Sequence, residues 1–176
     1  MAEEVVKAVG GLQNGSEKGY DSNHVMAYVY KKCADNNVFV NVTKLQKLLY
    51  CCYGVILAKF DARLTKEHPK AWQYGPVFPR TINAWRRGDI QKADDHGFPV
   101  ECPGEWLKWI DAAIRHYGKY SATQLSRWSH AQGSPWAEET DNGKNLLGEL
   151  DDFTIAKFFR GLIKGSPDGT VARGER

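Results

Sequence analysis

The sequence has no run of about 18 consecutive apolar residues, which is the length needed to cross a bilayer as a helix, so it predicts no membrane span. Its first residues, Met1–Glu4, end in two acidic side chains, and no apolar signal core follows them. On these two observations we expect neither an integral membrane protein nor a secretory precursor. We therefore expect a cytoplasmic protein.

Cysteine is scarce and is not arranged in pairs. None of the cysteines forms a C-x-x-C motif, and the adjacent Cys51 and Cys52 point in different directions on a predicted helix. This spacing favours buried, reduced thiols, and a zinc site or a redox switch is the alternative. The four cysteines are Cys33, Cys51, Cys52 and Cys102.

The sequence contains no recognisable catalytic or cofactor-binding motif. It has neither a G-x-x-x-x-G-K-S/T nor a G-x-G-x-x-G string, and no two histidines have the spacing of H-E-x-x-H. Ser129 and His130 are adjacent, but neighbours on a helix do not face each other, and no G-x-S-x-G elbow is present. We therefore predict a protein that is not an enzyme, with no cofactor and no metal.

Excess charge of one sign is also missing. The formal net charge is +3, which permits contact with nucleic acid but provides no dense basic stripe. The best local candidate is Arg86-Arg87 beside Trp85, but a solvated helix end is the favoured explanation of this cluster, because the other basic residues are dispersed. The charge pattern therefore does not argue for a nucleic-acid partner.

Apolar residues at helical spacing are abundant. The hydrophobic fraction is 42% and the aromatic fraction 12% over 176 residues, enough for one domain with a real core. We predict a mainly α fold, a single compact helical domain of about five to six helices with a small β-hairpin near residues 63–75. The expected helices span residues 22–36, 43–60, 79–88, 103–117, 121–132 and 152–164.

Residues 43–60 form the longest and most apolar of these predicted helices. Thr43 and Gln46 have the form of a capping box, which predicts the start of the helix. Leucines, cysteines and tyrosines then cover most of its circumference, and a helix that is apolar on most sides is buried on most sides. We therefore expect this helix to lie at the centre of the fold.

The segment after the central helix predicts the hairpin. Leu64-Thr65 and Ala71–Tyr74 are candidate strands around a turn at Glu67–Lys70. Gly75-Pro76 then marks a sharp change of direction, and Pro79 suits the first turn of the next helix.

Helix ends and chain ends are also predicted by local sequence. Asp21 or Ser22 is expected to cap the first helix, Ser121 with Gln124 forms a second capping box, and Asp151 or Asp152 is expected to cap the last helix. Phe153, Ala156, Phe159 and Ile163 follow one face of that last helix. We expect a flexible N-terminal segment at 1–21, a loop at 88–104, a folded domain at 22–164 and a disordered tail at 165–176.

Two tryptophans lie on irregular segments rather than on predicted helices. Trp72 precedes Gly75-Pro76, and Trp136 follows Ser134-Pro135. An aromatic side chain on a rigid loop is suited to anchor a protein partner, and it is equally suited to close the edge of a core. Both interpretations remain open from the sequence.

Two blocks of residues resemble the signatures of a known family. The first block, within 43–81, joins Leu45–Tyr50 (LQKLLY) to Ala71–Val77 (AWQYGPV). The second block, 117–136, carries Tyr117-Gly118, Ser121-Ala122, Leu125-Ser126, Ser129-His130 and Pro135-Trp136. In this order and spacing they are similar to the motifs of the Panacea domain, the SocA-like antitoxin family. The glycine-rich N-terminal segment and the acidic residues 141–164 match no motif of that family.

The resemblance implies a helical domain with a small β element near the AW-x-x-GPV motif. It also implies an antitoxin of a toxin–antitoxin system, found in bacteria, prophages and other mobile elements, that binds a cognate toxin directly. One type of member acts as an adaptor that delivers its toxin to a Clp-type AAA+ protease. The partner-binding candidates are Trp72, Tyr74, Gly75, Pro76, Val77, His130, Pro135 and Trp136, and the core motif is Leu45, Gln46, Leu48, Leu49 and Tyr50.

Two other functions remain as alternatives at this point. The domain could bind a host factor or nucleic acid in place of a toxin. It could also be a hydrolase that uses His130, which would require His130 to face a serine or a carboxylate inside a cleft.

Overall fold

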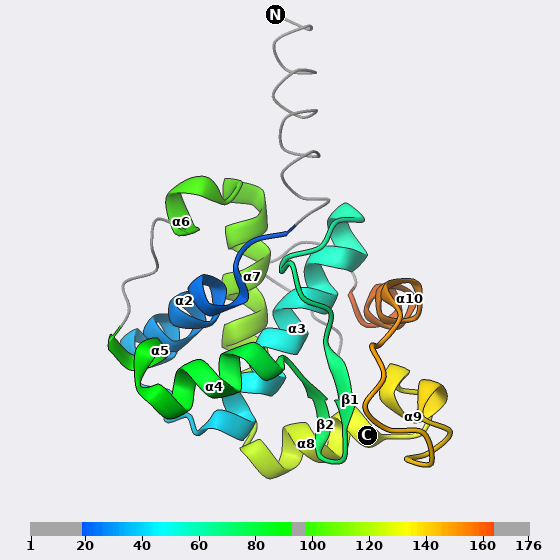
Figure 1. The fold of residues 1–176 in the computed structure, drawn as a ribbon. Coiled ribbons are helices and arrows are strands. Elements are labelled where there is room, and N and C mark those ends of the chain that lie inside the picture. The colour runs from blue at the N-terminus through cyan, green and yellow to red at the C-terminus, as the bar shows by residue number, and fades with distance from the viewer. Residues whose placement is uncertain (1–18, 93–97, 164–176) are drawn as a thin grey trace, which may run out of the picture.

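The computed structural model describes residues 19–92 and 98–163, and within these ranges the chain is mainly helical (Figure 1). Six helices of nine residues or more are present in this part of the chain, which confirms the predicted mainly α fold and its helices. They are α2 (Ser22–Asp35), α3 (Val42–Phe60), α4 (Pro79–Arg87), α7 (Gly104–Tyr117), α8 (Ala122–His130) and α10 (Asp152–Leu162). Shorter helical turns are α5 (Asp89–Lys92), α6 (Phe98–Glu101) and α9 (Pro135–Glu139).

Helix α3 lies at the centre, as its sequence predicts. Figure 1 shows α2, α4 and α5 to one side of it and α9 and α10 to the other. Every residue from Lys44 to Leu57 is buried, and α2, α7, α8, α10 and β2 all contact this helix. A helix surrounded in this way buries apolar surface on all sides, and it contributes more residues to the core than any other element of the described chain.

The start of α3 differs from the prediction. Asn41, and not Thr43, caps the helix by accepting a hydrogen bond from the Lys44 backbone N–H at 2.9 Å. The capping box fails because the Gln46 side chain is buried and bonds to residues of another segment. The second capping box is confirmed, since Ser121 and Gln124 exchange both reciprocal bonds.

Most other predicted helix ends are confirmed. Asp21 caps α2 and Asp151 caps α10. Pro79 occupies the first turn of α4, and Gly88 ends it with a left-handed φ of 80°. The predicted loop at 88–104 is wrong in part, because α5 and α6 lie within it.

The small antiparallel hairpin is present, but its strands are displaced from the expected pair. β1 (Lys70–Trp72) pairs with β2 (Gly75–Val77), and Gln73-Tyr74 form the two-residue turn. The predicted pairing of Leu64-Thr65 with Ala71–Tyr74 is wrong. Gly75 has a φ of 110°, which lets the chain reverse immediately after Tyr74, so Gly75–Val77 becomes the second strand.

Thr65 instead pairs with a residue near the start of the described chain. It forms a parallel bridge with Tyr20, whose N–H donates to Leu64 O at 2.8 Å and whose carbonyl accepts from the Lys66 N–H at 2.9 Å. The flexible segment predicted for 1–21 therefore does not include Tyr20. Residues 1–18 lie outside the described residues, as do 164–176 with the predicted tail.

The buried face of α10 also differs from the expected one. Ile155, Ala156 and Phe159 are buried, whereas Phe153 is 71% exposed. Phe153 lies in the first turn of α10 and is exposed, so the aromatic residue at this position does not belong to the buried face.

All four cysteines are buried and free, as expected for reduced structural thiols. Burial raises the pKa of the Cys33 thiol to about 11, which keeps this thiol protonated near neutral pH. Within residues 19–92 and 98–163, no group of three or more His, Cys, Asp and Glu side chains is placed to hold a metal ion. In the same ranges no helix combines the length and apolar character needed to cross a membrane.

Candidate functional site

The turn of the β-hairpin brings most of the predicted binding residues together. Tyr74 is 70% exposed at its tip, whereas Gly75, Pro76 and Val77, which follow directly, are buried. The turn thus exposes the large side chain of Tyr74 to solvent. The strand that follows it, β2, packs against α3 and α8.

Three consecutive carbonyl groups of this turn each contact a side chain from the second motif block. Trp136 Nε1 donates to Trp72 O at 2.8 Å, His130 Nε2 lies 2.7 Å from Gln73 O, and Ser126 Oγ donates to Tyr74 O at 3.0 Å. We call residues 72–75 with Ser126, His130 and Trp136 the clamped turn. These contacts fix the backbone of a short turn that few side chains of its own hold in place.

His130 has a structural position in this arrangement. Its Nδ1 lies 2.5 Å from Ser126 O, and its ring packs on the Trp136 indole with centroids 4.1 Å apart. Both ring nitrogens therefore face backbone carbonyls, which only accept hydrogen bonds. Ser129 Oγ is 3.4 Å from Nδ1, but it is 3% exposed and donates to Ser126 O, so this geometry does not favour the hydrolase alternative.

Two residues of the first motif block, Gln46 and Lys47 of α3, bond to the second strand of the hairpin and to the residues that follow it. Gln46 Oε1 accepts from the Phe78 N–H at 2.8 Å, and Gln46 Nε2 donates to Thr81 Oγ1 at 2.6 Å. Lys47 Nζ donates to Pro76 O at 3.1 Å and is 1% exposed. These two buried polar side chains connect α3 to β2 and α4. The other motif residues, Leu45, Leu48, Leu49 and Tyr50, lie in the core.

Burial lowers the pKa of the Lys47 ammonium to about 8, while the neighbouring Cys51 acts in the opposite direction. The loss of hydration accounts for the direction, because only the Pro76 carbonyl accepts a hydrogen bond from this amine among the described residues. Lys47 therefore occupies a site where its charged form is unfavourable.

Gly75 is required where β2 crosses Lys47. A Cβ added there would lie 2.5 Å from Ser129 Oγ and 2.7 Å from Lys47 Cε, and the φ of 110° is itself unfavourable for any other residue. We expect Gly75→Ala to lower the free energy of unfolding by about 1–3 kcal/mol, measured by urea unfolding. Gly133→Ala is the matched control, because Gly133 also has a left-handed φ, 85°, but nothing lies near its added Cβ.

An equal loss of stability in both variants would show that backbone conformation alone accounts for the cost at Gly75. A larger loss in Gly75→Ala would show that its close packing on Lys47 and Ser129 adds to that cost.

Burial divides the predicted binding residues into two groups. Ser134 caps α9 and Pro135 is its first residue. The next residue, Trp136, packs against the turn and is 6% exposed. Buried side chains do not reach a partner's surface in this conformation. We therefore assign the holding of the turn to the buried Pro135 and Trp136, while Tyr74 and the half-buried Trp72 remain available for contact. His130 is half-buried as well, and its two contacts with backbone carbonyls place it with the holding residues.

A segment that sequence analysis did not assign lies beside the hairpin. Residues 144–150, which we call the strap, run antiparallel to β1 on the edge opposite β2. The Leu147 N–H donates to Ala71 O at 2.8 Å, the Ala71 N–H donates to Gly148 O at 2.9 Å, and the Leu150 N–H donates to Pro69 O at 2.8 Å. In the sequence, the apolar pair Leu146-Leu147 was the one feature that distinguished this segment from a polar loop, and it did not predict the pairing with β1.

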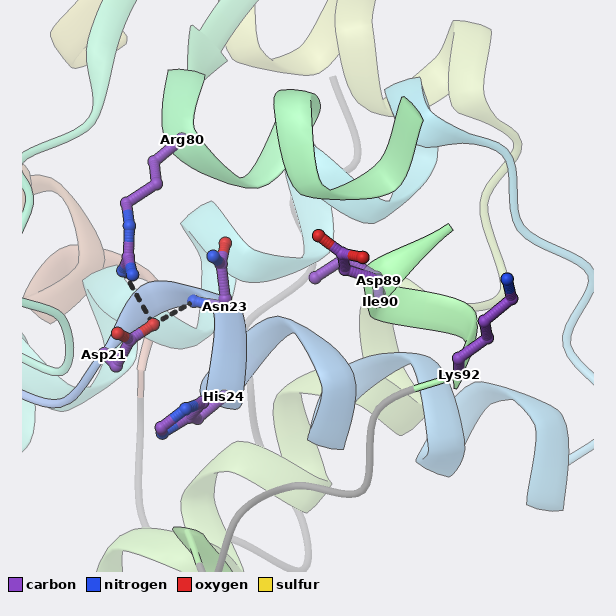
Figure 2. Close-up of a pocket in the computed structure, with 7 residues that line it drawn as sticks. All are labelled: Asp21, Asn23, His24, Arg80, Asp89, Ile90 and Lys92. Atoms are coloured by element: carbon purple, nitrogen blue, oxygen red, sulfur yellow. Dashed lines mark hydrogen bonds and ion pairs between the residues drawn. The ribbon is translucent and has the colours of Figure 1, made fainter. Parts of the chain in front are cut away.

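A polar pocket of about 370 Å³ is present on the other side of the molecule, between α2, α4 and α5 (Figure 2). Arg80 pairs with Asp21 at 2.7 Å, and Asp21 also accepts from the Asn23 N–H. Burial would raise the pKa of the Asp21 carboxyl, but its bonds to Arg80 and Asn23 bring the pKa below the ordinary value. The other lining residues are His24, Asp89, Ile90 and Lys92.

Asp21 and Arg80 of this pocket bond to each other, which explains these two side chains as a link between α2 and α4. Arg80 also pairs with Glu67, so its side chain joins the segment before β1 to the start of α2. Arg87, from the basic pair Arg86-Arg87, pairs with Asp89 at 2.8 Å at an exposed helix end. The clamped turn is therefore the better candidate for a binding site.

Comparison with known proteins agrees with the motif blocks. The family described as Antitoxin SocA-like, Panacea domain matches residues 45–137, which is more than half of the chain. Antitoxin SocA of Caulobacter vibrioides (strain NA1000 / CB15N) is 27% identical over 128 residues, covering 66% of this chain and 68% of that relative. No solved structure matches the chain. The matched region begins in α3 and ends in α9, and so includes the whole clamped turn.

Proposed function

Because the chain belongs to the SocA-like antitoxin family that carries the Panacea domain, we propose that it is an antitoxin that neutralises a cognate toxin by direct protein–protein binding. In this role it acts in the cytoplasm as a binding protein and not as an enzyme.

The observation that supports direct binding is the exposed Tyr74 on the clamped turn. A large aromatic side chain on a backbone held by three side chains loses little conformational freedom when a partner covers it. Tyrosine is also enriched among the residues that dominate binding energy at protein interfaces. We therefore place Tyr74 at the centre of the toxin contact, with Trp72 beside it on β1.

Replacing Tyr74 by alanine is expected to weaken toxin binding by at least about tenfold, since truncating an aromatic anchor typically costs 2 kcal/mol or more. The partner to use is the protein encoded by the reading frame next to this one, with affinity measured by titration calorimetry. Phe39→Ala is the matched control, because Phe39 is 86% exposed and belongs to the connection between α2 and α3, outside the hairpin.

Both variants should keep the wild-type circular dichroism spectrum and thermal midpoint, since both side chains are largely exposed. Equal affinity of the Tyr74→Ala and Phe39→Ala variants would move the contact away from the turn. Absence of binding by the wild-type protein would reject the neighbouring product as its toxin.

The same proposal has a sequestering and a delivering version. In the delivering version, this protein hands its toxin to a Clp-type AAA+ protease, so the toxin's half-life should fall when antitoxin and protease are both present. A half-life that does not change would leave sequestration as the mechanism, because binding alone neutralises the toxin without consuming it.

A further inference from the structure

We infer that the edge of β1 now covered by the strap is a docking site for an extended segment of the partner protein, which pairs with β1 after displacing the strap. The inference deepens the proposed function and depends on it. It concerns residues 144–150, whose backbone bonds to β1 and whose side chains, apart from that of the buried Leu150, are exposed.

The strap is held mainly through its backbone. Every residue from Lys144 to Glu149 is exposed, and Leu147 is 67% exposed. Two main-chain hydrogen bonds join it to Ala71 of β1, and a third joins Leu150 to Pro69, which directly precedes β1. An element with few buried apolar contacts and exposed backbone hydrogen bonds opens at a much smaller free-energy cost than the core does.

The strap is also strained at the residue that begins the pairing. Leu147 has a φ of 77°, a left-handed conformation that is unfavourable for a bulky side chain and that costs on the order of 1–2 kcal/mol. An incoming segment with regular β geometry would make the same main-chain bonds without this strain.

The two ends of the strap are fixed, so it would open as a loop. Leu150 is 1% exposed, and the Asp151 N–H donates to the Glu139 carboxylate at 2.9 Å. At the other end, Thr140 is 1% exposed, and its carbonyl accepts from the Asn145 N–H at 2.8 Å. These anchors allow residues 146–149 to leave β1 while α9 and α10 stay in place.

The occupant that fits the vacated edge is an extended peptide segment. With residues 146–149 displaced, β1 would offer the Ala71 N–H and the Ala71 O to the main chain of an added antiparallel strand. The clamped turn lies at the end of the same strand, so the segment would pass close to Tyr74. One partner surface would therefore engage both β1 and the turn.

A disulfide between strap and strand tests this inference. Lys70 and Glu149 oppose each other as a non-hydrogen-bonded antiparallel pair, because the bonds run from Ala71 to Gly148 and from Leu150 to Pro69. This geometry brings the two Cα atoms to about 4.5 Å, within the range that a disulfide spans. The double variant Lys70→Cys/Glu149→Cys would lock the strap on β1, and the native cysteines are all buried and separate from it.

We expect the oxidised double variant to bind the neighbouring-gene protein at least tenfold more weakly than its own reduced form. Reduction restores the affinity if the strap must move, and each single-cysteine variant controls for the loss of the Lys70 or Glu149 side chain. Oxidised and reduced forms that bind within twofold of each other would overturn the inference. That result would leave the proposed function intact, because the reduced form would still bind.

Hydrogen exchange on the wild-type complex provides a second measurement. Strand replacement requires the Ala71 amide to stay protected, since a partner carbonyl takes the place of Gly148 O, while the Leu147 amide loses its protection. Joint protection of the Ala71 and Leu147 amides in the complex would show that the strap stays on β1, and it would contradict the inference.

Discussion

Replacing Gly54 by alanine is expected to lower the free energy of unfolding by about 1–3 kcal/mol, although alanine is the stronger helix former. Gly54 lies in the middle of α3, where α10 packs across it. A Cβ added at Gly54 would overlap the Phe159 ring, well inside van der Waals contact. Because Phe159 is fully buried, the ring has no free space to enter, and α10 must move outward.

Gly161→Ala is the matched control for this prediction. Gly161 lies in α10, but nothing is within 4 Å of its added Cβ, so this variant should gain up to about 1 kcal/mol from helix propensity. Both are measured by urea unfolding with tryptophan fluorescence. Stabilisation by both substitutions would contradict the close packing of Phe159 on Gly54.

A second substitution can show that Phe159 is the residue that the added Cβ at Gly54 meets. Phe159→Leu alone should destabilise the protein, because it leaves a cavity beside Tyr50 and Trp128, whose rings contact Phe159. In the double variant Gly54→Ala/Phe159→Leu, the new methyl group occupies part of that cavity. We therefore expect the double variant to be more stable than the sum of the single effects predicts, by at least about 0.5 kcal/mol.

The second large effect concerns Lys47 and pH. Its pKa of about 8 in the folded protein lies below the ordinary value of 10.5, so the unfolded chain holds the extra proton between these two values. The contribution of Lys47 to stability therefore rises with pH through this window, and the cost of burying its charge is fully present below pH 8. At 1.36 kcal/mol per pKa unit, the whole change is about 3 kcal/mol.

Lys47→Met removes this pH dependence and keeps a side chain of similar length. We expect the free energy of unfolding of the wild type, minus that of the variant, to rise by up to about 1.4 kcal/mol per pH unit between pH 8 and 10. The difference is the quantity to measure, because the thiols titrate in this range in the unfolded chain while burial raises their pKa in the folded protein, so the cysteines also change the stability of both proteins with pH. Lys66→Met, at an exposed position, controls for the substitution itself.

Parallel stability curves for wild type and Lys47→Met from pH 7.5 to 10 would contradict the burial of a charged amine at this position. The two predictions concern different contacts of α3. The Gly54→Ala variant tests the contact of α3 with α10. The Lys47→Met variant tests the contact of α3 with β2, next to the clamped turn.

Local sequence determined much of this protein's architecture. The spacing of apolar residues predicted the long helices, and short capping motifs such as Ser121 with Gln124 fixed several of their ends. The apolar circumference of residues 43–60 predicted that α3 lies at the centre, and residues 44–57 of this helix are all buried. These features depend on residues three or four positions apart, and such pairs have the same geometry in any helix.

The motif blocks gave the candidate site its residues but not their roles. Trp72, His130 and Trp136 were predicted to meet a partner, yet the structure uses His130 and Trp136 to hold the turn and leaves Tyr74 as its most exposed member. Ser126 and the strap were not predicted as parts of the site, because a serine hydroxyl and a main-chain edge leave no periodic pattern in sequence.

Tertiary structure alone decided the remaining points. Gln46 was predicted to form a capping box with Thr43, but its side chain bonds to Phe78 and Thr81, 32 and 35 positions away. The hairpin register followed from Gly75, which fits only because its missing side chain leaves room for Lys47 and Ser129. Helices follow from contacts between near neighbours, so the sequence predicts them. Buried polar bonds and close backbone approaches join distant segments, so their partners are known only once the chain has packed.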